Sequence, residues 1–185
     1  MKKFLTGLLI ISMVVILAGC GAKKTNKPEE EKITGNCTVF ECIKNIDVTD
    51  SLETVNEKMG FDGKKDKETD NYSIYIWNVT KDSKVTIQFN NGGKSNITIE
   101  FDKAKIANDK LDLSKSDEIK STIQKGEMTL SKFNEMVGNV EGTLVEKSGY
   151  SKKYLWYKAS DSYLYGTFSN TSNKCTFMSG RTPQK

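Results

Sequence analysis

The 185-residue sequence contains no histidine. That absence excludes catalysis by Ser-His-Asp or Cys-His groups and metal sites built on imidazole. Carboxylates such as Glu135, Glu141 and Glu146 are present, but no nucleophile, base and orienting group share a spacing typical of an active site. Glu57 and Glu135 recur at matching places, where each fits a solvated helix position. We therefore expect no enzyme, no metal site and no cofactor.

The sequence also lacks a strong excess of charge of either sign. The formal net charge is +4 at pH 7, and Lys2 and Lys3 of the N-terminal segment account for two of these charges. The remaining lysines are scattered among acidic residues, as on an ordinary solvated surface. No nucleic-acid partner is expected.

Long hydrophobic runs are missing except at residues 4–18, which are too short and wrongly flanked for a membrane span. The motif "LAGC", Leu17 to Cys20, resembles a bacterial lipoprotein signal; an ordinary secretory signal or a transmembrane helix is the alternative. The resemblance implies a signal peptide over 1–19 and a lipid on the Cys20 thiol, which holds the protein to the outer side of the bacterial cell membrane. Residues 20–36 are charged and predict a flexible tether.

Three further cysteines remain, so they cannot all pair with one another: Cys37, Cys42 and Cys175. Cys37 and Cys42 could form a short disulfide in an oxidising exterior, although a separation of five residues along a helix is poor geometry. The sequence leaves that bond open. Cys175 is expected to be a buried apolar residue.

An internal repeat organises the rest of the chain. The stretch "SLETVNEKMG" (51–60) matches "TLSKFNEMVG" (129–138) in its first hydroxyl residue, its Leu, its Asn-Glu pair and its final Gly. Further on, "YIW" (75–77) matches "YLW" (154–156), and "FNN" (89–91) matches "FSN" (168–170). The pattern indicates duplication into a first repeat over 37–102 and a second over 116–185, joined by a linker over 103–115.

Each repeat predicts two short helices and then an antiparallel sheet. Thr38 and Glu41 form a capping-box pattern before one helix, and Ser51 and Thr129 are suitable N-caps for the matching helices. Strands are expected at 71–79, 84–90 and 96–102, and at 143–149, 153–159, 162–169 and 174–179. A first strand of the first repeat would fall in the very polar "DGKKDKE". The expected class is α+β, with two tandem units, each a helix-loop-helix on one face of its own sheet of three or four strands.

Alternation along the hairpins predicts which aromatic side chains are exposed. Val85, Ile87 and Phe89 are expected in the core. An even-numbered turn then places Ile74 and Ile76 with them. In the second repeat the same alternation assigns Leu155, Tyr157, Leu164 and Phe168 to the core. The outward residues would be Tyr75, Trp77, Tyr154, Trp156, Tyr163 and Tyr165. A bulge would flip one strand, and the aromatic faces could also cover each other or be crossed by the linker.

These features resemble the tandem fold of the β-lactamase-inhibitor protein (BLIP-like), whose unit also occurs singly in small outer-membrane assembly lipoproteins. The most telling stretch is "GEMTLSKFNEMVG" (126–138), with Gly126, Met128 and Thr129 in place and one Glu inserted; the first repeat lacks the Gly-Met pair. The resemblance covers residues 38–180. It implies that a sheet face grips a target protein and that a hairpin-turn aspartate, here Asp82 with its copy Asp161, enters the target.

The expected function is therefore a membrane-anchored module that binds a protein of unknown identity through its exposed aromatic sheet faces. The alternatives are a structural or assembly lipoprotein of the envelope, an inhibitor of a β-lactamase-like secreted enzyme, or a protein that binds a peptide or small ligand between the sheets.

Overall fold

The structure, a computed structural model, describes residues 34–182. The predicted signal peptide, Cys20 and most of the predicted tether lie outside the described residues. Within them, none of the helices is long and apolar enough to cross a membrane.

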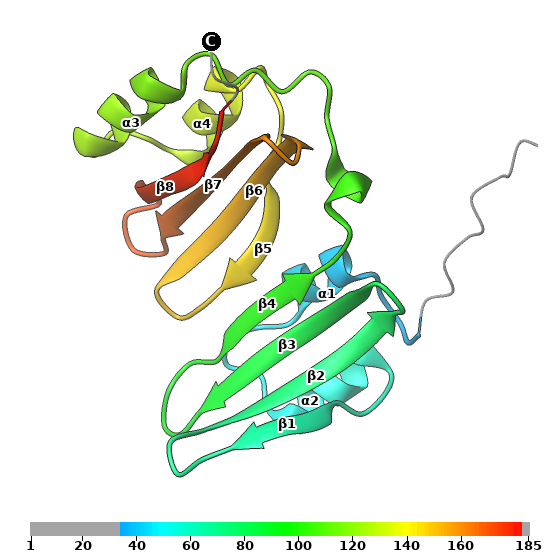
Figure 1. The fold of residues 1–185 in the computed structure, drawn as a ribbon. Coiled ribbons are helices and arrows are strands. Elements are labelled where there is room, and N and C mark those ends of the chain that lie inside the picture. Colours follow the sequence, from blue (N-terminus) through cyan, green and yellow to red (C-terminus); the bar gives the residue numbers. More distant parts are fainter. Residues whose placement is uncertain (1–33, 183–185) are drawn as a thin grey trace, which may run out of the picture. The chain divides into compact units, whose positions relative to one another are not determined.

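The helices and strands follow the predicted order twice (Figure 1). The first repeat contains α1 (Val39–Asn45), α2 (Leu52–Met59), β1 (Lys64–Glu68), β2 (Tyr72–Thr80), β3 (Ser83–Asn90) and β4 (Asn96–Glu100). The linker contains the short 3-10 helix η1 (Lys103–Ile106). The second repeat contains α3 (Ser116–Gln124), α4 (Leu130–Met136), β5 (Thr143–Lys147), β6 (Ser151–Ala159), β7 (Ser162–Ser169) and β8 (Cys175–Arg181). The polar stretch "DGKKDKE" does form a strand, β1, and all its side chains are exposed.

The prediction of two tandem units with separate sheets is wrong. All strands join one antiparallel eight-stranded sheet in the order β1 to β8, and the described residues fall in one compact unit. The junction is the pairing of β4 with β5, where Ile97 lies opposite Lys147 and Thr98 opposite Glu146. Two separate sheets would leave β4 and β5 as open edges with unpaired backbone groups, and their pairing covers part of both edges.

Local sequence signals set the helix ends as expected. Thr38 and Glu41 form the full capping box: Glu41 Oε2 accepts from the Thr38 backbone N–H at 2.9 Å, and Thr38 Oγ1 accepts from the Glu41 N–H at 3.3 Å. Ser51 and Thr129 cap α2 and α4 through their hydroxyl oxygens. Gly60 ends α2 in the left-handed region, with φ of 79°, a conformation that costs glycine little.

The disulfide that the sequence left open is formed: Cys37 and Cys42 are bonded, with their Cα atoms 5.7 Å apart. The expected poor geometry does not arise, because Cys37 precedes the N-cap Thr38 and is not part of the helix. Cys175 is buried and free, as expected.

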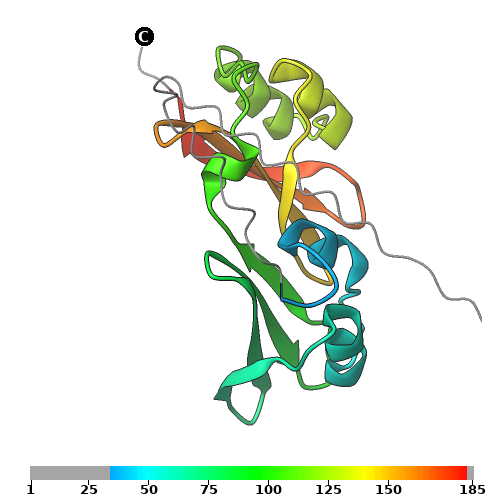
Figure 2. The same ribbon diagram turned by 90° about the vertical axis from the view of Figure 1, so that its right-hand side faces the viewer.

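Two buried clusters hold the helices against one face of the sheet. In the first repeat, residues of α1 and α2 such as Ile43 and Val55 pack with strand residues such as Ile87. In the second, Ile119 and Phe133 of α3 and α4 pack with Leu164. Figure 2 shows α1 and α2 on one side of the strands of the first repeat. We call the covered side the helix face and the other side the open face.

Candidate protein-binding face

One extra residue in β2 and one in β6 decide which side chains reach each face. Thr80 pairs with Ser83 across the hairpin turn, but the register shifts between Asn78 and Thr80, so that Trp77 lies opposite Val85. In the second repeat the register shifts between Tyr157 and Ala159. A bulge of this kind turns the remainder of its strand over relative to its partner.

The predicted outward placement of Trp77 and Trp156 is therefore wrong. Their exposed fractions are 0% and 1%. Each indole Nε1–H donates to a helix asparagine, Trp77 to Asn56 Oδ1 at 3.1 Å and Trp156 to Asn134 Oδ1 at 3.0 Å.

The same asparagines each hold a glycine that closes over the indole. Gly63 N–H donates to Asn56 Oδ1 at 3.0 Å, and Gly142 N–H to Asn134 Oδ1 at 3.2 Å. A Cβ atom on either glycine would collide with the neighbouring tryptophan ring. The duplicated Asn, Gly and Trp residues therefore form a structural unit of the core.

Tyr75 and Tyr154 also lie on the helix face, where they are half-buried, so their outward assignment is wrong as well. Each makes an edge-on contact with the repeated phenylalanine of the next strand: the ring centroids are 5.8 Å apart for Tyr75 and Phe89, and 5.7 Å for Tyr154 and Phe168. Burial raises the pKa of the Tyr154 hydroxyl. For the same reason Ile74, Ile76, Leu155 and Tyr157, expected in the helix-covered core, lie on the open face.

Asp82 and Asp161 occupy the predicted hairpin turns and are exposed. The Asp82 backbone N–H donates to Thr80 Oγ1 at 3.3 Å, and Asp161 Oδ1 accepts from the Ser162 hydroxyl at 3.1 Å. Both bonds are ordinary local turn contacts, and the two aspartates lie at the ends of different hairpins rather than in one site.

The open face is continuous from one edge of the sheet to the other. A single row of opposed residues crosses every strand: Lys64, Ile76, Thr86, Thr98, Glu146, Lys153, Thr167 and Phe177. Thr98 and Glu146 belong to β4 and β5, so the row passes through the junction of the repeats without a break. Figure 1 shows α1 and α2 behind strands β1–β4, away from this face.

Tyr163 and Tyr165 are the predicted binding residues that do lie on the open face, and Tyr157 joins them. Their rings form a ladder: the centroids of Tyr157 and Tyr163 are 6.4 Å apart, and those of Tyr163 and Tyr165 are 5.7 Å apart. Lys103 Nζ lies 5.6 Å from the Tyr163 centroid and 5.9 Å from that of Tyr165. Lys153 Nζ lies 5.4 Å from the Tyr165 centroid. These are cation–π distances.

The linker covers part of this face, which was one of the alternatives open at the sequence level. The Asn108 backbone N–H donates to the Tyr157 carbonyl at 3.0 Å. Phe101 and Ile106 join the same apolar cluster as the buried Leu155. The linker thus shields Leu155, while the tyrosines stay half-buried and in reach of solvent.

Phe177 and Arg181 of β8 were not identified from the sequence. A register shift places Phe168 opposite Cys175 but Thr167 opposite Phe177, so that Phe177 reaches the open face beside Tyr165. Its exposed fraction is 60%. Arg181 lies opposite Tyr163 on the same face. The one sequence signal was a large aromatic residue in the last predicted strand.

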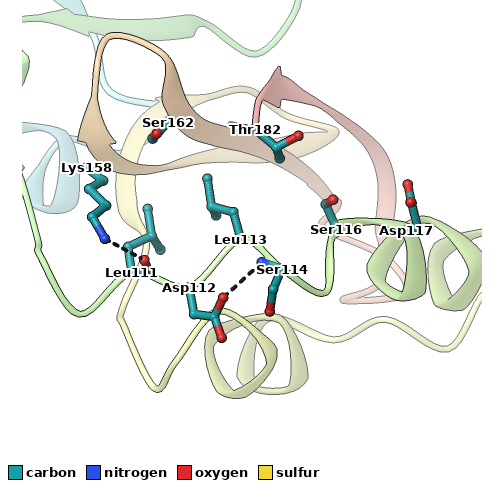
Figure 3. A pocket seen from close by; sticks show the side chains of 9 residues that line it. All are labelled: Leu111, Asp112, Leu113, Ser114, Ser116, Asp117, Lys158, Ser162 and Thr182. Carbon is teal, nitrogen blue, oxygen red and sulfur yellow. Dashed lines mark hydrogen bonds between the residues drawn. The ribbon is translucent and has the colours of Figure 1, made fainter. Parts of the chain in front are cut away.

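Elsewhere, a hollow of about 470 Å³ lies between the linker, the start of α3 and the β6–β7 hairpin (Figure 3). Lys158 Nζ donates to the Leu111 carbonyl at 3.5 Å, and Asp112 Oδ1 accepts from the Ser114 N–H at 2.9 Å. Hydrogen bonds from Ser114, with smaller help from nearby lysines, lower the pKa of the Asp112 carboxyl.

Within residues 34–182 no group of acidic residues or cysteines could hold a metal ion. Burial raises the pKa of the Cys175 thiol to about 11, which keeps it protonated and unreactive at neutral pH.

No known protein family matches the chain, and no curated protein or solved structure matches it either. The resemblance to BLIP-like proteins therefore stays a prediction from the motifs.

Proposed function

We propose that this protein is a lipid-anchored, extracytoplasmic module that binds another protein through the open face of its eight-stranded sheet. The observation that carries the proposal is the unbroken row of side chains across that face, which ends at the exposed Phe177. Sheet faces without a covering layer that carry exposed aromatic residues and arginine are typical of protein interfaces.

The anchor rests on the "LAGC" motif and Cys20. Cells that express the chain should incorporate labelled palmitate into it and retain it in the membrane fraction. Cys20→Ser should abolish both. Labelling that persists in Cys20→Ser would reject Cys20 as the lipidation site.

The binding face is best tested by photo-crosslinking in the native envelope. A photoreactive phenylalanine analogue at Thr98 or Thr167, both on the open face, should give the same crosslinked protein. The matched control is the analogue at Lys132, an exposed residue of α4. Equal crosslinking from Lys132, or none from the open face, would reject the proposal.

The identity of the crosslinked protein also separates the alternatives from the sequence. A large envelope complex would indicate an assembly lipoprotein. A secreted β-lactamase-like enzyme whose activity falls on binding would indicate an inhibitor, and Asp82→Ala should then relieve the inhibition.

A further inference from the structure

We infer that the second-repeat part of the open face recognises an acidic protein segment. The relevant surface, here called the basic aromatic patch, consists of Lys103, Lys153, Tyr157, Tyr163, Tyr165, Phe177 and Arg181. This inference rests on the proposed function and specifies the chemistry of the partner.

The charge on the open face is strongly one-sided. The register and the contacts of Lys103 with the tyrosines place six basic residues on it, Lys64, Lys67, Lys84, Lys103, Lys153 and Arg181, and two acidic ones, Glu100 and Glu146. Lys84 pairs with Glu100 at 3.1 Å and Lys153 with Glu146 at 3.4 Å. Among the described residues, Lys103 and Arg181 form no ion pair, so their charges are available to a partner.

The helices show no such excess of basic residues, since α1 and α4 each hold one acidic residue and one lysine. Acidic residues predominate in α2 and in the first turn of α3, where Glu53, Glu57, Asp117 and Glu118 outnumber the basic Lys58 and Lys120. An acidic partner is therefore attracted to the open face rather than to these helices. Such complementarity steers association and selects orientation.

The geometry of the patch favours a protein over a glycan. Sugar rings stack on free aromatic faces, but Lys103 and Lys153 already lie over the rings of Tyr163 and Tyr165. Carboxylates can instead bind the ammonium groups and accept bonds from the tyrosine hydroxyls. Phe177, 60% exposed, supplies an apolar anchor at the rim of the same patch.

The first repeat has no matching patch. The register places Lys84 and Thr86 where the second repeat has Tyr163 and Tyr165, and Glu100 where it has Arg181. Glu100 neutralises Lys84 there. The acidic segment should therefore bind over β6, β7 and β8.

The test uses the full-length lipidated protein in nanodiscs of phosphatidylcholine, with a random library of 12-residue peptides as the probe. Selected peptides should be enriched in Asp and Glu next to an aromatic or aliphatic residue. Their affinity should fall about tenfold or more in Lys103→Glu and in Arg181→Glu, and with added salt.

Lys132→Glu on α4 is the matched charge control and should bind normally. Arg181→Gln, which removes the charge without reversing it, should give a smaller loss. Circular dichroism verifies that each variant is folded.

The other outcomes are distinguishable. Peptides without acidic enrichment that still lose binding in Thr98→Arg would overturn the inference and leave the proposed open-face function intact. If peptide binding is unchanged in all three variants, Thr98→Arg, Lys103→Glu and Arg181→Glu, the inference and the proposed open-face function are both rejected. If no acidic peptide is selected and the protein instead binds vesicles of phosphatidylglycerol, with that binding lost in Arg181→Glu, the partner is a lipid surface and not a protein. Self-association lost in the same variant would assign the patch to a second copy of the chain.

Discussion

Strands β3 and β7 occupy equivalent places in the two repeats, and their similarity depends on the face that each side chain meets. Toward the helices, β3 presents Val85 and Phe89, and β7 presents Leu164 and Phe168. The preceding strands place a Tyr and a Trp on the same side in both repeats. On the open face the residues differ in kind, from lysine and threonine in β3 to two tyrosines in β7.

This difference explains why the repeated aromatics are poor markers of a binding site. A packed interior tolerates few changes of shape, so a duplicated core keeps the same residues in both copies. A solvated face has no such constraint, and each copy can acquire its own chemistry. The positions that differ between the repeats, above all Tyr163, Tyr165, Phe177 and Arg181, are therefore the better functional candidates.

The largest expected effect comes from removing the repeated tryptophans. Trp77→Ala and Trp156→Ala should each lower the free energy of unfolding by about 3–5 kcal/mol, because each leaves a cavity and removes the indole donor from its asparagine. Urea unfolding followed by circular dichroism measures both. Similar losses in the two repeats would support the shared core role. A loss below about 1 kcal/mol at either site would contradict the burial described above.

The glycines beneath the indoles provide the next test. Gly63→Ala and Gly142→Ala should each cost about 1–3 kcal/mol of unfolding free energy, because the added methyl group collides with a tryptophan ring in a packed core. Gly93→Ala is the matched control, since its Cβ would meet only the Asn90 Cβ at 3.6 Å. If the control and the core substitutions cost the same, the glycines have no packing role.

The disulfide distinguishes the repeats, because among the described residues only the first repeat has one. Dithiothreitol should lower the unfolding free energy of the wild type by about 2 kcal/mol, the chain-entropy value for a loop this short. The double variant Cys37→Ser with Cys42→Ala serves as the control and should not respond to the reductant. An equal response of both proteins would mean that the effect comes from elsewhere.

Much of the fold was predictable from local sequence signals. The cap residues located α1, α2 and α4, and alternating apolar residues located the strands apart from β1. The faces of β2 and β6 could not be predicted, because single-residue bulges at Val79 and Lys158 invert the register without any glycine or other marker. The β4–β5 junction was missed because Thr98 and Glu146 fit an exposed edge equally well. Of the predicted binding residues, Tyr163 and Tyr165 remain candidates on the open face.

The smallest effect concerns how the first helix of each repeat begins. Glu41 closes a capping box on α1, whereas α3 has no side-chain cap at Lys115. Hydrogen bonds from Thr38 lower the pKa of the Glu41 carboxyl from its ordinary value. A carboxyl whose folded pKa is depressed stabilises the protein above its unfolded pKa, and that stabilisation is lost as the pH falls through the folded value.

The wild type should therefore lose more stability than Glu41→Gln between pH 5 and pH 3, as measured by urea titrations at each pH. Glu118→Gln in α3 is the matched control and should follow the wild type. Parallel pH profiles for the wild type and Glu41→Gln would show that the ionised carboxylate adds nothing that a neutral amide cannot supply at this cap.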